Sequence, residues 1–184
     1  MEEIFICVDV ETAGPIPAKY AMLSVGACLV WQPDVTFYTE LKPDRSEADA
    51  EALAVSGLDP HTLQQTGMEP EAALLAFEAW IQEHVPQGAR PVFVGLNAPF
   101  DWMFVHDYFM RYLGRNPLGH SALDIKAYYM GQMGVDWSET TLTHLSSHFL
   151  EEISLTHNAL RDAQDQALIF QKILKQNPKF NRGE

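Results

Sequence analysis

The chain has 184 residues, 47% hydrophobic and 20% charged, enough for one domain with an ordinary core. Its formal net charge of −13 argues against broad electrostatic binding of nucleic acid, because affinity for phosphate normally comes from Lys and Arg. No run of 18 apolar residues occurs and the N-terminus is acidic where a signal peptide would be basic, so we expect a cytoplasmic protein without a membrane span.

The N-terminal part predicts three strands. The apolar run at 4–10 is typical of a central strand, and two further runs at 21–31 and 35–42 follow short connections that contain Pro, Gly or Asp. Such connections favour antiparallel neighbours. Cys7 and Cys28 lie inside these apolar runs, so we interpret them as buried reduced thiols rather than a disulfide or a metal-binding pair.

Strand and helix patterns alternate in the rest of the chain. In order they predict a helix at 46–56, a helix at 70–84, a buried strand at 91–96, a helix at about 99–113, a short strand entering a helix at 121–130, and helices at about 140–150 and 158–176. Three early strands followed by this alternation indicate an α/β fold, with a central mixed sheet of about five strands flanked by helices.

Acidic side chains stand where two predicted strands end. Asp9 and Glu11 are two positions apart at the end of the first strand, so their side chains would point to one face. Asp101 lies about one helical turn beyond the strand at 91–96, in the kind of crevice where α/β sheets bind ligands. Each motif alone is more often structural, because acids are common where a strand meets solvent and in the first turn of a helix.

The last helix has an unusual start. The segment "THNALRDA" places His157 before a plausible N-cap, Asn158, and places Asp162 in the second turn. Asp162 would lie near the core boundary, whereas Asp165 looks like an ordinary surface residue. A lone His before a helix is more often a capping or packing residue, so this motif too is inconclusive by itself.

Together the three motifs resemble those of the DEDDh family of 3′–5′ exonucleases, which includes ribonuclease T and the proofreading subunit of bacterial DNA polymerase III. The residues that match Asp-x-Glu-Thr, Asn-Ala-x-Phe-Asp and His-x4-Asp are Asp9, Glu11, Thr12, Asn97, Ala98, Phe100, Asp101, His157 and Asp162. The likeness spans about 4–174 of a single exonuclease domain, 1–184, with a short tail at 177–184. It implies an RNase H-like fold and hydrolysis of phosphodiester bonds.

Two positions depart from the family pattern. Leu96 stands where a His usually precedes the Asn-Ala pair, and Pro15 stands where a bulky apolar residue is common. Neither position is a metal ligand in the family, so we expect these differences to affect how the substrate is held rather than the chemistry.

The resemblance implies that Asp9, Glu11, Asp101 and Asp162 hold two divalent metal ions. Carboxylate oxygens suit Mg²⁺ or Mn²⁺. Two such ions about 3.5–4 Å apart can hold the attacking and leaving oxygens of an in-line displacement. His157 would take the proton from the attacking water, a task that suits an imidazole, whose unperturbed pKa is near 6.5.

Substrate contacts are expected from four residues. Thr12 and Ala13 would offer backbone N–H groups to the terminal nucleotide, and Asn97 and Phe100 would complete the contact, Phe100 by stacking. The expected substrate is the 3′ end of single-stranded or short DNA or RNA. The expected products are nucleoside 5′-monophosphates. A homodimer or a partner subunit could supply the missing basic surface. The alternative is an RNase H-like binding or scaffold module with weak or no activity, which an incomplete set of motif residues would favour.

Overall fold

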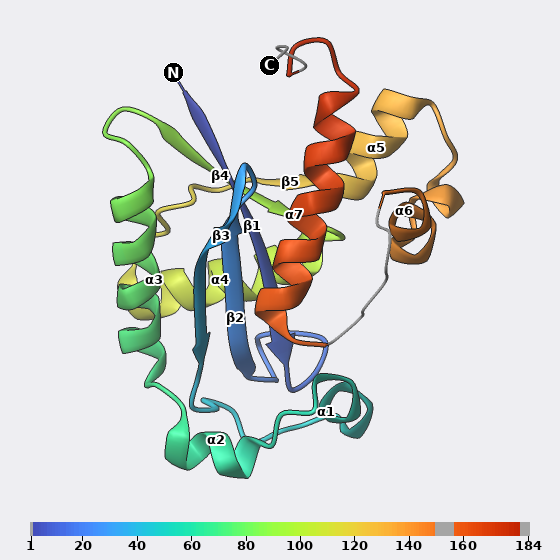
Figure 1. Ribbon diagram of the computed structural model, residues 1–184. Helices are drawn as coiled ribbons and strands as arrows, with labels where there is room; N and C mark the ends of the chain where they lie inside the picture. Colours follow the sequence, from blue (N-terminus) through green and yellow to red (C-terminus); the bar gives the residue numbers. More distant parts are fainter. Residues whose placement is uncertain (1, 150–156, 181–184) are drawn as a thin grey trace.

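The computed structural model describes residues 2–149 and 157–180 (Figure 1). A mixed sheet with the strand order β3-β2-β1-β4-β5 lies at its centre. Its strands are β1 (Glu3–Thr12), β2 (Met22–Leu29), β3 (Gln32–Glu40), β4 (Arg90–Gly95) and β5 (Ala122–Asp124). The first three pair antiparallel, β4 runs parallel to β1, and β5 runs parallel to β4. The predicted five-stranded mixed sheet is confirmed.

Helices cover both faces of the sheet. They are α1 (Ala50–Ser56), α2 (Pro60–Thr66), α3 (Pro70–His84), α4 (Ala98–Leu113), α5 (Ile125–Met133), α6 (Leu142–Phe149) and α7 (Ala159–Lys175), with a 3₁₀ turn, η1, at Trp137–Thr140. In Figure 1, α4 lies behind the sheet and α3 stands to its left, whereas α7 lies in front of it with α5 and α6 beside it. No helix in the described ranges is long and apolar enough to cross a bilayer. The predicted end of a helix at residue 150 and the end of the tail lie outside the described residues.

The central strand divides its side chains between two cores. Val8 and Val10 belong to the core beneath α3 and α4, whereas Cys7 belongs to the core beneath α7. Because residues i and i+2 of a strand share a face, Asp9 and Glu11 lie on the same side as Cys7. The alternation of β1 therefore directs both carboxylates toward α7.

Helix α7 crosses the sheet over Gly26 of β2, a residue without a side chain. Gly26 pairs with Asp9 across the β1–β2 ladder, and a Cβ added to Gly26 would lie 2.3 Å from the carbonyl carbon of Ala159. Only glycine lets the first turn of α7 approach the sheet so closely. This contact holds His157, just before that turn, and Asp162, within it, next to β1.

Replacing Gly26 with Ala is expected to destabilise the protein by about 1–3 kcal/mol, the usual cost of forcing an extra carbon into a packed core. The control is Gly131→Ala on α5, where a Cβ would meet nothing within 4 Å. That change should stabilise the helix by about 0.5–1 kcal/mol. Thermal unfolding compares the two variants. If Gly26→Ala were as stable as the parent, the close approach of α7 would not depend on glycine.

Candidate active site

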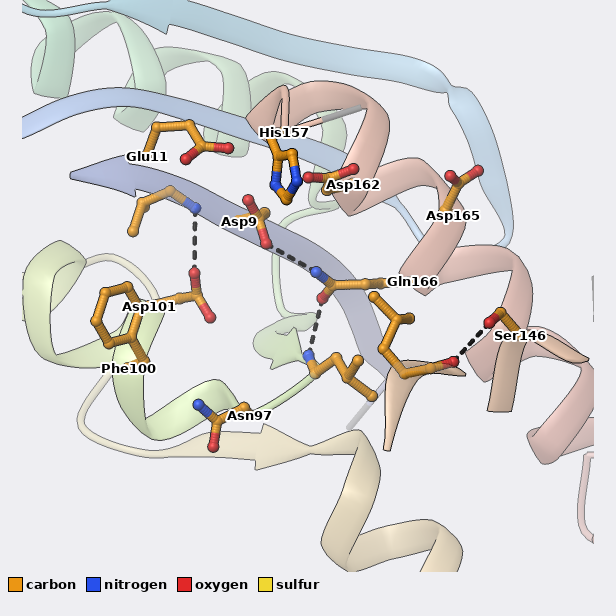
Figure 2. A pocket seen from close by; sticks show the side chains of 13 residues that line it. Asp9, Glu11, Asn97, Phe100, Asp101, Ser146, His157, Asp162, Asp165 and Gln166 are labelled. Atoms are coloured by element: carbon orange, nitrogen blue, oxygen red, sulfur yellow. Dashed lines mark hydrogen bonds between the residues drawn. The ribbon is translucent and has the colours of Figure 1, made fainter. Parts of the chain in front are cut away.

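A cavity of about 390 Å³ lies at the carboxyl ends of β1 and β4. Segments that are far apart in the sequence line it: the end of β1, the start of α4, and the start of α7, with part of α6 (Figure 2). All five residues predicted to be catalytic line this cavity, namely Asp9, Glu11, Asp101, His157 and Asp162. The structure therefore brings the three sequence motifs to one place.

Three carboxylates form a tight cluster in the cavity. Asp9, Glu11 and Asp162 each offer an oxygen, and these atoms all lie within 4.8 Å of one another. Figure 2 shows the ring of His157 beside them, with Asp101 approaching from the other side on the first turn of α4. Carboxylates this close repel one another and lose hydration, so such a cluster favours cations in its midst.

Burial and mutual repulsion raise the pKa values of these acids. The pKa of Asp9 is well above its usual value, first through burial and then through the charges of Asp101, Asp162 and Glu11. Burial, followed by the charge of Asp162, raises the pKa of Glu11 to about 7. Burial also raises the pKa of Asp101 to about 8, although the N–H of Val10 donates to its Oδ1 at 3.1 Å. Divalent cations that prefer oxygen ligands fit this set of carboxylates. Their positive charge offsets the negative charge of the acids, which burial otherwise makes unfavourable.

The same shifts predict how the stability of the metal-free protein depends on pH. Glu11 and Asp101 bind protons with pKa values of about 7 and about 8 in the folded protein, against 4.5 and 3.8 as ordinary values. Between about pH 4 and pH 8 the folded state therefore holds more protons than the unfolded chain, and the free energy of unfolding falls as pH rises. In EDTA we expect a higher Tm near pH 5 than near pH 8. A Tm that rises across this window would contradict these shifts.

Two residues hold unusual backbone conformations at the cavity. In the described part of the chain, the non-glycine residues with positive φ are Asn97 (φ 63°) and His157 (φ 48°), and both line the cavity. Asn and His adopt this left-handed conformation more readily than most residues, at a cost of roughly 1–3 kcal/mol. The turn at Asn97 is further fixed by Asp124, whose Oδ2 accepts the N–H of Ala98 at 2.8 Å. The cavity therefore lies at the starts of two helices, α4 and α7, each of which is preceded by a residue with a constrained backbone.

An apolar wall faces the acidic cluster. Phe100 of α4, Leu142 of α6 and Leu96 contribute to it, and Asn97 and Ser146 line the cavity nearby. The side chain of Asn97 caps no N–H of α4. Leu96, which replaces the usual histidine of the family, thus adds apolar surface to the cavity rather than a polar group.

The end of β1 and the turn after it carry Thr12 and Ala13, two of the residues expected to contact the substrate. Thr12 and Ala13 are buried, and neither lines the cavity. The N–H of Ala13, predicted to contact a nucleotide, donates to the carbonyl of Ala21 at 2.8 Å, and its contact with substrate stays a prediction. The hydroxyl of Thr12 donates to the carbonyl of Gly14 at 2.9 Å, and the role of its backbone N–H stays a prediction.

Sequence reasoning missed two residues of α7. Asp165, which looked like a surface residue, lines the cavity, and burial raises its pKa. Gln166 is 5% exposed; its Nε2 donates to Oδ1 of Asp9 and its Oε1 accepts the N–H of Leu96, both at 2.8 Å. The signal in the sequence was spacing, because Gln166 follows Asp162 by four residues and lies one turn further along the same face.

Known proteins show the same organisation over nearly the whole chain. The family model described as Exonuclease, of the ribonuclease T type, matches residues 6–170. The 3′–5′ DNA exonuclease Cap18 of Escherichia coli is 43% identical over 178 residues, which cover 97% of this chain and 95% of the relative. Ribonuclease T of Klebsiella pneumoniae subsp. pneumoniae is 25% identical over 180 residues, covering 92% and 83% of the two chains.

A solved structure agrees at the level of the fold. The nuclease domain of 3′hExo, a DEDDh family member bound to rAMP, matches with a TM-score of 0.77 at 13% identity, covering 95% of this chain and 92% of that one. With a family member 43% identical and the family model spanning the three motifs, an inactive scaffold is not supported. The chain belongs to the ribonuclease T-type exonuclease family and is a 3′–5′ exonuclease with the RNase H-like fold of DEDDh nucleases.

Proposed function

We propose that this enzyme removes nucleotides one at a time from the 3′ end of single-stranded or short nucleic acid, releasing nucleoside 5′-monophosphates. The observation that carries the proposal is the convergence of Asp9, Glu11 and Asp162 within 4.8 Å, in a cavity shared with His157. A cavity closed by α6 and α7 on one side suits a chain end better than the middle of a duplex. The name of the 43% identical relative favours DNA over RNA as the substrate.

The acidic residues would hold two divalent metal ions, Mg²⁺ or Mn²⁺. Asp9, Glu11, Asp101 and Asp162 are the ligands we assign, since all four line the cavity and oxygen ligands suit these ions. When bound, such ions supply a more acidic water and offset the negative charge of the phosphate. The protein's own task is to hold the carboxylates still. The N–H of Val10 does this for Asp101, which is 4% exposed.

His157 is assigned as the general base. It lies in the cavity beside the three carboxylates, while its side chain remains exposed at the cavity mouth. From this position the imidazole can accept a proton from a water molecule that attacks the phosphate. It can then release the proton to solvent, because the ring is not enclosed.

The apolar wall would receive the terminal nucleotide. Phe100 is half-buried against Phe104, with ring centroids 5.4 Å apart, and still lines the cavity. A base or sugar can pack on Phe100, Leu96 and Leu142, and contacts of this kind tolerate any base. The side chain of Asn97, which also lines the cavity, would hydrogen-bond the nucleotide.

The direct test uses 5′-labelled single-stranded DNA and RNA of one sequence, incubated with Mg²⁺, with Mn²⁺ and with EDTA. We expect a ladder that shortens from the 3′ end, unlabelled nucleoside 5′-monophosphates as products, and no cleavage in EDTA. DNA should be degraded faster than RNA. Internal cleavage, 3′-monophosphate products, or full activity in EDTA would each refute the proposal.

Salt dependence should be shallow. Several basic side chains already form ion pairs with carboxylates, namely Lys19, Lys42, Arg45, Arg111 and Arg115. We therefore expect one to three phosphate contacts, which gives a slope of log affinity against log salt between about −0.7 and −2 for single strands. Strands of about three and about twenty nucleotides should have similar KM values. A slope steeper than about −3 with a strong preference for long strands would instead indicate that a second copy or a partner supplies basic surface.

A further inference from the structure

Gln166 is a polar side chain on the buried face of α7. The buried residues around it on this helix include Ala163, Ala167 and Phe170, and Gln166 itself is 5% exposed. A buried amide costs free energy unless both its oxygen and its nitrogen have partners. Both have them, and both partners belong to the active-site cavity.

The hydrogen bonds of Gln166 fix which way its amide points. Oε1 accepts the backbone N–H of Leu96 at 2.8 Å and lies 3.9 Å from the Cys7 thiol, which also donates. Nε2 donates to Oδ1 of Asp9 at 2.8 Å. If the amide were flipped, an NH₂ group would face the N–H of Leu96 and an oxygen would face a carboxylate, so the flipped arrangement satisfies neither end.

The amide therefore bridges two parts of the cavity. Asp9 lies on β1 within the carboxylate cluster, and Leu96 directly precedes Asn97, whose left-handed backbone begins the turn into α4. Figure 2 shows Gln166 beside Asp9, with a dashed hydrogen bond between them and a second one at the amide oxygen of Gln166. The orientation of the Asp9 carboxylate is thus tied to the turn that forms the apolar wall.

We propose that Gln166 is a positioning residue: it holds one oxygen of Asp9 so that the carboxylate keeps the orientation in which Asp9, Glu11 and Asp162 bind metal together. The proposal rests on the function proposed above. In metal sites generally, removing a hydrogen-bond partner of a ligand weakens metal binding or activity by about 10- to 100-fold. A glutamine with a purely structural role would affect stability alone.

Two variants remove the bridge in different ways. Gln166→Met keeps the length of the side chain without the amide, and Gln166→Glu keeps its shape but replaces the donor with an acceptor. The matched controls are two other glutamines of α7 whose amide nitrogens donate to backbone carbonyls away from the cavity. Gln171→Met removes the bond to Val30, and Gln164→Glu changes the charge at the bond to Pro33.

The measurement is Mn²⁺ binding to metal-stripped protein by calorimetry, without substrate, alongside Tm in EDTA and kcat as a function of Mn²⁺. We expect the Kd for Mn²⁺ to rise by about 10- to 100-fold in Gln166→Met and further in Gln166→Glu, with both controls like the parent. High Mn²⁺ should recover part of the kcat of Gln166→Met. Should that variant fail to fold, the isosteric Gln166→Glu carries the test.

The contrary outcome is a folded Gln166 variant that binds Mn²⁺ as the parent does and loses only as much Tm as Gln171→Met. That result would overturn the positioning role, and the proposed function would still stand. If the parent protein itself bound no Mn²⁺, the metal site and the role of Gln166 would both be refuted.

Discussion

Replacing Asp9 with Asn should abolish hydrolysis and leave the fold intact. The substitution removes a proposed metal ligand from the carboxylate cluster, so the loss of kcat should exceed the roughly 10- to 100-fold that follows loss of an outer hydrogen-bond partner. The side-chain oxygen of Asn can still accept from Gln166, as Oδ1 of Asp9 does. The assay is release of nucleotides in Mg²⁺ and in Mn²⁺.

The same variant should be more stable than the parent when metal is absent. Burial and the neighbouring acids raise the pKa of Asp9, which shows that its charge is disfavoured in the folded state. In EDTA near pH 8, Asp9→Asn is therefore expected to have a higher Tm. Asp34→Asn, at an exposed acid on β3, controls for the change in net charge. Near-normal turnover of Asp9→Asn in Mg²⁺ would contradict the assignment of Asp9 as a ligand.

Replacing His157 with Ala should lower kcat by roughly 10²–10⁴, the usual contribution of general acid–base catalysis. Binding of Mn²⁺ should not change, because the carboxylate cluster is complete without the imidazole. His148→Ala is the control, since His148 is an exposed histidine on α6 that does not line the cavity. If His157→Ala bound Mn²⁺ much more weakly, His157 would be a ligand rather than a base.

Local patterns were sufficient to predict most of the fold. Apolar runs and their turn-forming boundaries predicted the five strands seen in the described residues, and the predicted buried thiols Cys7 and Cys28 are cross-strand partners in the sheet. The first strand was placed too short: β1 continues to Thr12, so Glu11, just beyond the predicted run at 4–10, lies inside the ladder together with Asp9. Their convergence followed from period-two geometry all the same.

Short elements were harder to predict. The seven-residue helix α2 was missed although Asp59 caps it and Pro60 occupies its first turn, because it carries too few apolar positions to show a period. Leu63 is the one residue of this helix that is buried.

The candidate site was predictable where a motif is local and unpredictable where it depends on packing. The spacing of His157 and Asp162 is visible in the sequence, and both line the cavity. Gln166 acquires its partners only when α7 lies against β1 and the end of β4, since its two main partners are 157 and 70 residues away in the chain. The bonding of the Ala13 N–H to Ala21 likewise depends on how the turn after β1 folds back.

Asp9, Glu11, Asp101 and Asp162 are proposed to act together in holding the metal ions that support hydrolysis. A crystal of the enzyme grown with Mn²⁺ and a nucleoside 5′-monophosphate, with anomalous diffraction measured at the manganese edge, tests this claim directly. We expect two anomalous peaks about 3.5–4 Å apart, both ligated by these four carboxylates, with the nucleotide packed on Phe100. Manganese bound elsewhere, or a cavity that holds the nucleotide without any manganese at the four carboxylates, would contradict it.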